Sequence, residues 1–274
     1  MLYELHQEEL NKIEALLSGN RVNLEIKAIA AKNNPGWVFV DDYNNPKTAL
    51  VYSHGQKGFY FVGQPNNPTF ETALLQTMVD LQPRLAGLNV DYFEYSGTSL
   101  DWENYLERLF THKNYKQFTQ HVYLMPEIQM PSWQEGRGGK VAKITKDLLD
   151  NPTINTLFVE NILKNWWDST DKFLEKGSGY AVVCEGKAVS ICCICFLAGD
   201  KDWGLGVYTH PEYQNRGYAK EAAIAVLEES RQHGVRLYWD CMESNTPSRK
   251  LAVSLGFTLA FSYQVYNYEL TNLS

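Results

Sequence analysis

The residues with the clearest chemical potential lie in a short loop, QNRGYAKEAA, at positions 214–223. Small residues stand at Gly217 and Ala219, immediately before a run that favours a helix. A helix N-terminus presents backbone N–H groups and the positive end of the helix dipole, and an anion approaches them closely only where side chains are small. The spacing therefore predicts a cradle for a diphosphate, with Gln214 and Arg216 adding donors at its rim. The alternative is a glycine that only turns the chain and an alanine that only begins a core face.

Three acidic residues near this loop are candidates for a general base. The sequence RLYWDCM at 236–242 predicts a strand, with Asp240 on one face of it. Glu243 follows at the end of that strand, and Glu212 precedes the loop. Each of the three also fits a solvated surface charge, and Glu212 fits best a role in its own turn.

The cysteines and histidines give weaker signals. Cys241 is either a nucleophile in a cleft or a small buried apolar residue, which is the commoner role of a free cysteine. Cys193 and Cys195 share one face of a predicted strand, but the sequence has no CxxC, HxH or HExxH spacing. We therefore expect no metal. His210 beside the loop fits a turn residue better than a catalyst.

The whole chain of 274 residues has an ordinary globular composition, with 44% hydrophobic and 21% charged residues. No apolar run approaches the roughly 20 residues of a membrane helix. The N-terminus MLYELHQEEL does not resemble a signal peptide. Five cysteines, an odd number, favour a reducing cytoplasm over a disulfide framework. The net charge of −7 argues against a nucleic-acid surface and mildly favours a cationic substrate such as an amine.

Two halves with a similar order of elements are predicted. Residues 1–126 form an N-terminal α/β domain, 127–140 a linker rich in glycine and proline, and 141–274 a second domain. Each half has the order β-β-β-α-β-α-β. In the first half we expect strands at 37–42, 48–53, 58–63, 90–95 and 115–125, and helices at about 69–82 and 99–110.

The second half has the clearer pattern. We expect helices at 153–165 and 169–176 and then three strands, 179–185, 188–199 and 203–209, joined by tight turns. An amphipathic helix runs from Ala219 to about Gln232 and ends at Gly234. After the strand at 236–242, Thr246 caps a short helix, and aromatic strands follow from Phe257 to Leu270.

The second half resembles a known family on these residues. VYTHPEYQNRGYAKEAA looks like the coenzyme A signature of the GNAT superfamily of N-acetyltransferases, and Asn245-x-x-Ser248 and Leu255-Gly256-Phe257 match its fourth helix and following turn. One branch, a bacterial two-domain GNAT acetyltransferase family, is echoed further by WWDSTDKFLEKGSGYAVV and AVSICCICF. The resemblance implies an α/β (α+β) class and a GNAT fold, with a mixed, mostly antiparallel twisted sheet flanked by helices. A second, degenerate GNAT-like half precedes it.

The resemblance also implies a site for acetyl-CoA as cosubstrate. Acetyl-CoA would lie between the strands at Val207–Thr209 and Leu237–Cys241, splayed apart, with its diphosphate on the amides from Asn215 to Lys220. Arg249 or Lys250 would reach its phosphates. The implied cofactor-binding residues are Val207, Tyr208, Thr209, Gln214, Asn215, Arg216, Gly217, Tyr218, Ala219, Lys220, Asn245, Ser248 and Arg249.

The implied reaction is direct transfer of an acetyl group to an amine of a small molecule or a protein N-terminus. Many GNAT enzymes place a tyrosine seven residues after the asparagine to protonate the leaving thiolate, but here the residue is Ala252. A general acid helps this reaction without being obligatory, and Tyr263, Tyr266 and Tyr268 of the last strands are the candidates to replace it. The catalytic residues predicted on this basis are Glu243, Asp240 and Tyr266.

The first half lacks an equivalent diphosphate loop. The matching segment, GQPNNPTF at 63–70, contains two prolines, so we expect this half to wall the acceptor site instead. Two other functions remain open: a non-catalytic acyl-CoA sensor, favoured by Ala252, and an aminoacyl-tRNA-dependent transferase, disfavoured by the acidic charge. We expect a monomer or homodimer with no nucleic-acid or membrane partner.

Overall fold

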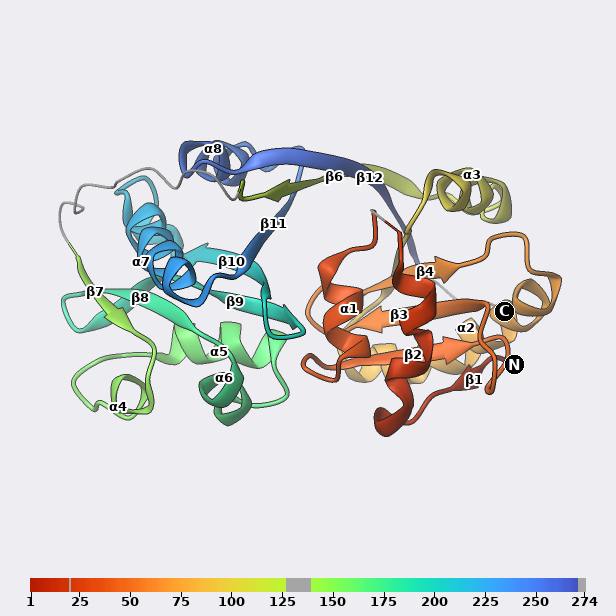
Figure 1. The fold of residues 1–274 in the computed structure, drawn as a ribbon, viewed down its shortest axis with the longest axis horizontal. Helices are drawn as coiled ribbons and strands as arrows, with labels where there is room; N and C mark the ends of the chain where they lie inside the picture. Colours follow the sequence, from red (N-terminus) through yellow and green to blue (C-terminus); the bar gives the residue numbers. More distant parts are fainter. Residues whose placement is uncertain (20, 127–138, 271–274) are drawn as a thin grey trace. The chain divides into compact units, whose positions relative to one another are not determined.

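The computed structural model describes residues 1–19, 21–126 and 139–270, which form two compact units (Figure 1). Unit 1 contains Met1–Gln120 and the described residues from Phe261 on, and unit 2 contains His121–Ala260. The sequence analysis assigned all of 141–274 to the second domain, whereas the contacts group the end of the chain with unit 1. The predicted linker lies outside the described residues except for its last two positions.

The sheet of unit 1 follows the order β1-β2-β3-β4-β5-β12. Strands β2, β3 and β4 form an antiparallel meander, β4 and β5 are parallel, and β12 is antiparallel to β5. This last pairing is the reason that the C-terminal strand belongs to unit 1. The strand bounds are β1 Tyr3–Glu4, β2 Gly36–Val40, β3 Thr48–Ser53, β4 Gly58–Gly63, β5 Tyr92–Gly97 and β12 Thr258–Glu269.

Helices cover both faces of this sheet. The 3-10 helix η1 (Gln7–Leu17) and α1 (Leu24–Ala30) pack on an aliphatic face, whereas α2 (Pro68–Gly87) and α3 (Leu100–Leu109) pack on an aromatic one. The sequence analysis did not predict η1 and α1. The aromatic core includes Phe59, Phe61, Phe93, Tyr95, Trp102, Phe110 and Tyr266, all at most 2% exposed.

The sheet of unit 2 follows the order β6-β11-β10-β9-β8-β7. Strands β7 to β10 are antiparallel neighbours, and β11 is parallel to β10. The bounds are β6 Lys116–Leu124, β7 Lys140–Lys143, β8 Gly179–Cys184, β9 Lys187–Ala198, β10 Asp202–Thr209 and β11 Arg236–Met242. Strands β6 and β12 each have residues in both units.

The long crossover helix α7 (Tyr218–His233) packs on β8 and β9 through the buried stripe Ala222, Ala223, Val226 and Leu227 (Figure 1). Its buried Glu229 accepts hydrogen bonds from Lys143 Nζ and Ser178 Oγ, both at 2.9 Å. The other helices are α4 Lys146–Leu149, α5 Leu157–Trp166, α6 Thr170–Lys176, η2 Pro211–Tyr213 and α8 Thr246–Ser254. Within the described ranges, no helix has the length and apolar character needed to cross a bilayer.

Candidate functional site

The pairing between strands β10 and β11 ends halfway along the two strands. Their parallel pairing runs from Asp202 opposite Arg236 to Leu205 opposite Trp239 and then stops. Beyond that point β10 continues to pair with β9 on its other side, as far as Thr209 opposite Ser190. The facing edges of the two strands are therefore open from Gly206 and Asp240 onward, at the position where the resemblance implies splayed strands.

Two backbone N–H groups of β10 point into this opening. The N–H of His210 donates to the carbonyl of Val189 in β9 at 2.9 Å. Because N–H groups alternate between the two edges of a strand, the N–H of Tyr208 also points toward β9, and those of Val207 and Thr209 point toward the opening. Of Val207, Tyr208 and Thr209, which the resemblance implies as cofactor-binding, two therefore have an N–H directed toward the opening.

The loop after β10 presents five successive N–H groups. Asn215 and Gly217 have positive φ values, 62° and 88°, and α7 begins at Tyr218. Within the described chain, no acceptor lies in hydrogen-bond geometry to any backbone N–H from Asn215 to Ala219. Gly217 is the N-cap and has no side chain to satisfy them. Successive N–H groups in such a turn make an anion-binding concavity at a positive helix end.

Glycine at 217 is required by the backbone itself. A φ of 88° is in the left-handed region, where residues with a Cβ are strained, and a Cβ built at Gly217 meets no atom within 4 Å. The Gln214 and Arg216 side chains, predicted as rim donors, contact the loop instead. Gln214 Nε2 lies 3.4 Å from the Thr209 carbonyl oxygen, and the Arg216 guanidinium lies 3.1 Å from that of Glu212.

The start of α8 is held by side chains that were predicted to face the cofactor. Asn245 is the N-cap, and its Oδ1 accepts from the Ser248 N–H at 3.2 Å; the prediction of Thr246 as the cap is therefore wrong. Ser248 Oγ accepts from Trp239 Nε1 at 3.0 Å, and Arg249 donates to the Glu243 carbonyl at 2.8 Å. The Trp239–Ser248 bond fixes α8 against β11, and the Arg249–Glu243 bond ties it to the segment that follows β11.

The two acidic candidates of unit 2 have different surroundings. Asp240 is half-buried at the first position of β11 beyond the paired region, and its Oδ2 accepts from the Tyr238 hydroxyl at 3.1 Å. Glu243 has a 58% exposed side chain, with Oε1 lying 3.6 Å from His121 Nε2. Asp240 is therefore the better placed carboxylate beside the opening.

The structure does not bring Tyr266 to these residues. Tyr266 is fully buried in the aromatic core of unit 1, stacked on Tyr95, and its hydroxyl donates to Glu107 at 3.1 Å. Tyr263 and Tyr268 are 3% and 5% exposed. Burial raises the pKa of the Tyr266 hydroxyl, so this residue is a poor proton donor to a ligand.

The cysteines of unit 2 are buried. Cys241 is 6% exposed, and burial raises the pKa of its thiol, which disfavours the reactive thiolate. Cys193 Sγ and Cys195 Sγ are 4.0 Å apart. No group of three or more His, Cys, Asp or Glu side chains with metal-site geometry occurs among residues 1–19, 21–126 and 139–270.

An aromatic cluster on the Asp240 side of the sheet was missed. Gly204 lies opposite both Tyr238 and Phe196. Side chains two or four residues apart on a strand share a face, so Tyr208 of β10 is on the same face as Asp240 of β11. The Tyr208 hydroxyl accepts from Trp166 Nε1 at 2.8 Å. No periodicity signalled this cluster, because an extra residue of β9 shifts the register between Gly204 and Leu205.

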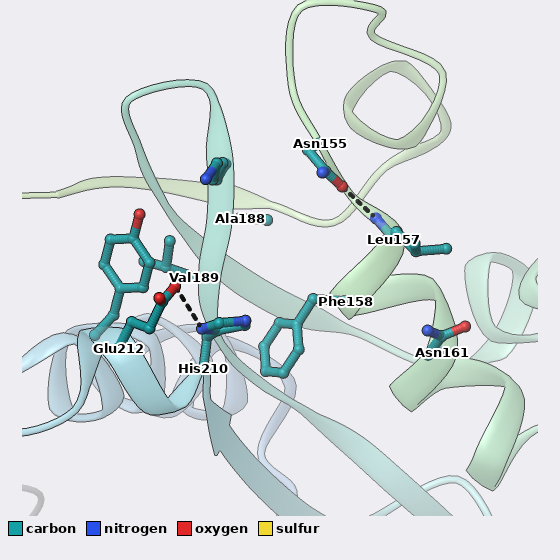
Figure 2. Close-up of a pocket in the computed structure, with 10 residues that line it drawn as sticks. Asn155, Leu157, Phe158, Asn161, Ala188, Val189, His210 and Glu212 are labelled. Carbon is teal, nitrogen blue, oxygen red and sulfur yellow. Dashed lines mark hydrogen bonds and ion pairs between the residues drawn. The ribbon is translucent and has the colours of Figure 1, made fainter.

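A cavity of about 340 Å³ adjoins the loop on the α5 side (Figure 2). Phe158 of α5 faces His210, with ring centroids 5.9 Å apart, and Val189 also lines the cavity. His210 Nδ1 lies 3.7 Å from Glu212 Oε2, consistent with the predicted roles of both residues in the turn. His210, Glu212 and Tyr213 line this cavity and directly precede the loop whose N–H groups have no acceptor in the described chain.

The open strand pair followed by an uncapped crossover helix is the architecture of the GNAT acyltransferases. The chain belongs to the GNAT acetyltransferase family, whose model matches residues 14–266. It is 24% identical over 270 residues to the uncharacterized N-acetyltransferase YdfB of Bacillus subtilis (strain 168), and the match covers 97% of this chain and 98% of the relative. The predicted family is confirmed.

Solved structures agree on the fold. A GCN5-related N-acetyltransferase-like protein from Streptococcus suis 89/1591 is similar with a TM-score of 0.66 at 20% identity, over 96% of this chain and 100% of that one. A tandem GNAT protein from the clavulanic acid biosynthesis pathway is similar with a TM-score of 0.61 at 10% identity, over the full length of both. The predicted α/β class, with a mixed, mostly antiparallel sheet flanked by helices, is confirmed.

Proposed function

We propose that the protein is an acetyl-CoA-dependent N-acetyltransferase of the cytoplasm, acting on a small-molecule amine or a protein N-terminus. The observation that carries the proposal is the row of five N–H groups from Asn215 to Ala219, for which the described chain supplies no acceptor. Asn215, Arg216 and Gly217 are exposed, so this row is open to a ligand at the positive end of α7, which fits a diphosphate. The five cysteines, all free thiols, support the compartment.

Residues of unit 2 offer partners for successive parts of coenzyme A. The N–H row and Lys220 would hold the diphosphate, and the N–H groups of Val207 and Thr209 would hold the pantetheine arm in the opening. Acetyl-CoA supplies an acetyl group activated as a thioester. Asn245, Ser248 and Arg249 would line the α8 side, which the Trp239–Ser248 bond holds against β11.

Asp240 is the proposed general base. A primary amine with a pKa near 10.4 is mostly protonated at pH 7, and neutralising it costs roughly 4.6 kcal/mol. A carboxylate beside the opening accepts that proton, and the Tyr238 hydroxyl at 3.1 Å orients it. Glu243, exposed at the strand end, is the second candidate and would act from the solvent side.

Calorimetric titration with acetyl-CoA tests this proposal. Lys220 is exposed at the third position of α7, where an aspartate favours the helix dipole and leaves the fold intact. In Lys220→Asp the added carboxylate competes for the N–H row and repels the diphosphate. We expect affinity to fall about 10- to 100-fold, that is about 1.4–2.7 kcal/mol. The matched Lys220→Ala protein loses only the cation and should lose less. Unchanged binding in Lys220→Asp, or no binding to wild type at millimolar acetyl-CoA, contradicts the proposal.

A non-catalytic acyl-CoA sensor is the second candidate. Ala252 is fully buried on α8 and supplies no proton donor for a leaving thiolate. A sensor binds acetyl-CoA yet acetylates no amine in a broad panel. Turnover of an amine that drops in Asp240→Asn excludes it.

A further inference from the structure

Three polar side chains share one face of the sheet in unit 1. Asn267 of β12 lies directly opposite Glu94 of β5, and Ser96 is two residues further along β5 on the same face. Directly opposed residues of an antiparallel pair have Cβ atoms about 4.5–5.5 Å apart. We call these three residues the Glu94 face.

No side chain of the Glu94 face has a hydrogen-bond or ion-pair partner within the described chain. Glu94 and Asn267 are half-buried, and Ser96 is only 3% exposed. Glu25, on the same side of the sheet, shows the contrasting case: it accepts from the Ser53 hydroxyl and from the Tyr60 hydroxyl at 2.9 Å. None of their side-chain oxygens is fully buried, so three adjacent polar groups that reach solvent without a partner in the described chain form a surface that can receive a ligand.

Gly58 of β4 leaves room for the Glu94 carboxylate. A Cβ built at Gly58 would lie 3.1 Å from Glu94 Oε1, so the carboxylate occupies the space above the glycine. Burial raises the pKa of Glu94 to about 7, and no neighbouring charge contributes to this shift. Burial and the Glu94 charge raise the pKa of Tyr92, two residues away on the same strand. A carboxylate without a countercharge in such a position gains most from a bound cation.

We propose that the Glu94 face binds a protonated primary amine. An ammonium group has three N–H donors, and the face offers three acceptors: a carboxylate, a hydroxyl and an amide oxygen. The single carboxylate supplies the charge match, and the two neutral oxygens complete the shell without the extra negative groups that a divalent metal prefers. Amine binding here does not depend on acetyl transfer. Identifying this amine as the acceptor rests on the proposed function.

The test is a pH titration of the full-length protein labelled with carbon-13 at the glutamate carboxyls, with and without n-propylamine and without acetyl-CoA. Bound ammonium should lower the pKa of Glu94 by about one unit, and n-propanol at equal concentration should not. Glu94→Gln identifies the signal. The amine dissociation constant should rise at least about tenfold in Glu94→Gln, the loss expected for a charge-assisted contact.

Two further variants separate the site from general charge attraction. Gly58→Ala crowds the carboxylate without removing it and should weaken amine binding severalfold. Glu269→Gln, which removes an exposed carboxylate opposite Tyr92 on β12, should leave binding unchanged. An unshifted Glu94 pKa, or equal losses in Glu94→Gln and Glu269→Gln, overturns the proposal. Amine binding without acetyl-CoA binding would support the Glu94 site and contradict the proposed transferase. Acetyl-CoA binding without amine binding would support the transferase and contradict the Glu94 site.

Discussion

Each unit contains one parallel strand pair joined through a crossover helix, and the two pairs end differently. In unit 1, β5 stays paired with β4 up to its own last residue, Gly97 opposite Phe61, and Thr98 then donates to the Phe61 carbonyl from both its N–H and its hydroxyl at 3.2 Å. In unit 2, β10 and β11 separate after Leu205 and Trp239. The same connection therefore gives a closed edge in one unit and an opening in the other.

The crossover helices that connect the two strands of each pair also differ, in how their N-termini are capped. Helix α2 is capped by Asn67, whose Oδ1 lies 3.3 Å from the Phe70 N–H and whose Nδ2 donates to Asp41 at 2.7 Å and Thr48 at 2.9 Å. Helix α7 starts at Gly217 with no side-chain cap. A ligand is needed at the N-terminus only where the chain itself supplies no acceptor. We therefore expect an anion site only where an open strand pair adjoins an uncapped helix.

The largest expected effect follows from the carboxylate at the start of the opening. Asp240→Asn keeps the shape and the contact with Tyr238 but removes the proton acceptor, so we expect kcat for acetylation to fall about 10²–10⁴-fold. Binding of acetyl-CoA should change little. Steady-state kinetics between pH 6 and 9 measure this, and the loss should shrink at high pH, where more of the amine is neutral.

The matched control for Asp240 is Glu243→Gln, which alters an exposed carboxylate one residue beyond the end of β11. It should change kcat less than about threefold. A large loss in Glu243→Gln with little loss in Asp240→Asn would move the base to the strand end. Equal rates in the wild type, Asp240→Asn and Glu243→Gln would mean that neither carboxylate acts as the general base.

The second prediction compares two buried carboxylates, one in each unit. Glu94 has a pKa raised to about 7 by burial. A raised carboxyl pKa contributes stability that is present below the unfolded pKa of about 4.5 and is lost as pH rises through 7. Burial also raises the pKa of Glu229, but hydrogen bonds from Lys143, Tyr180 and Ser178 outweigh it and leave the pKa below its ordinary value. Glu229 therefore stabilises unit 2 above the unfolded pKa, and that contribution is lost as pH falls.

The two substitutions should act in opposite directions. Glu94→Gln should stabilise unit 1 at pH 8 by about 1–3 kcal/mol and have little effect at pH 4. Glu229→Gln should destabilise unit 2 at pH 8 by about 1–2 kcal/mol and less at pH 4. Urea unfolding at both pH values, followed by hydrogen exchange in each unit, measures the effects. Changes of the same sign would refute the assignment of the two environments.

The sequence was informative where a local rule governs structure. The strands from 37 to 63 and the helix ending at Gly234 follow from alternation, turn residues and a left-handed cap with φ of 59°. The uncapped start of α7 was predictable because Gly217 has no side chain to cap the helix, and its role as a diphosphate loop stays a prediction. Thr246 was mistaken for the cap because Asn245 and Thr246 both suit that position, and only the backbone decides between them.

Pairing between distant residues was not predictable. Tyr266 was proposed for the site of unit 2, yet β12 pairs with β5 and carries it into the core of unit 1. The Glu94 face depends on the register between β5 and β12, and the Trp166–Tyr208 contact depends on the extra residue in β9. Such features are fixed by tertiary register, for which a single sequence has no local signal.

The smallest expected effect tests whether an uncapped helix is sufficient for an anion site. Asn67→Gly removes the cap of α2 and its bonds to Asp41 and Thr48, at a cost of about 1 kcal/mol in the free energy of unfolding. Because β4 and β5 remain paired to Gly97, the exposed N–H groups have no opening beside them to admit a pantetheine arm. Calorimetry should still give one acetyl-CoA per chain, as in wild type. Binding of a second acetyl-CoA by the variant would mean that the Asn67 cap alone prevents binding in unit 1, and that the strand opening is not required.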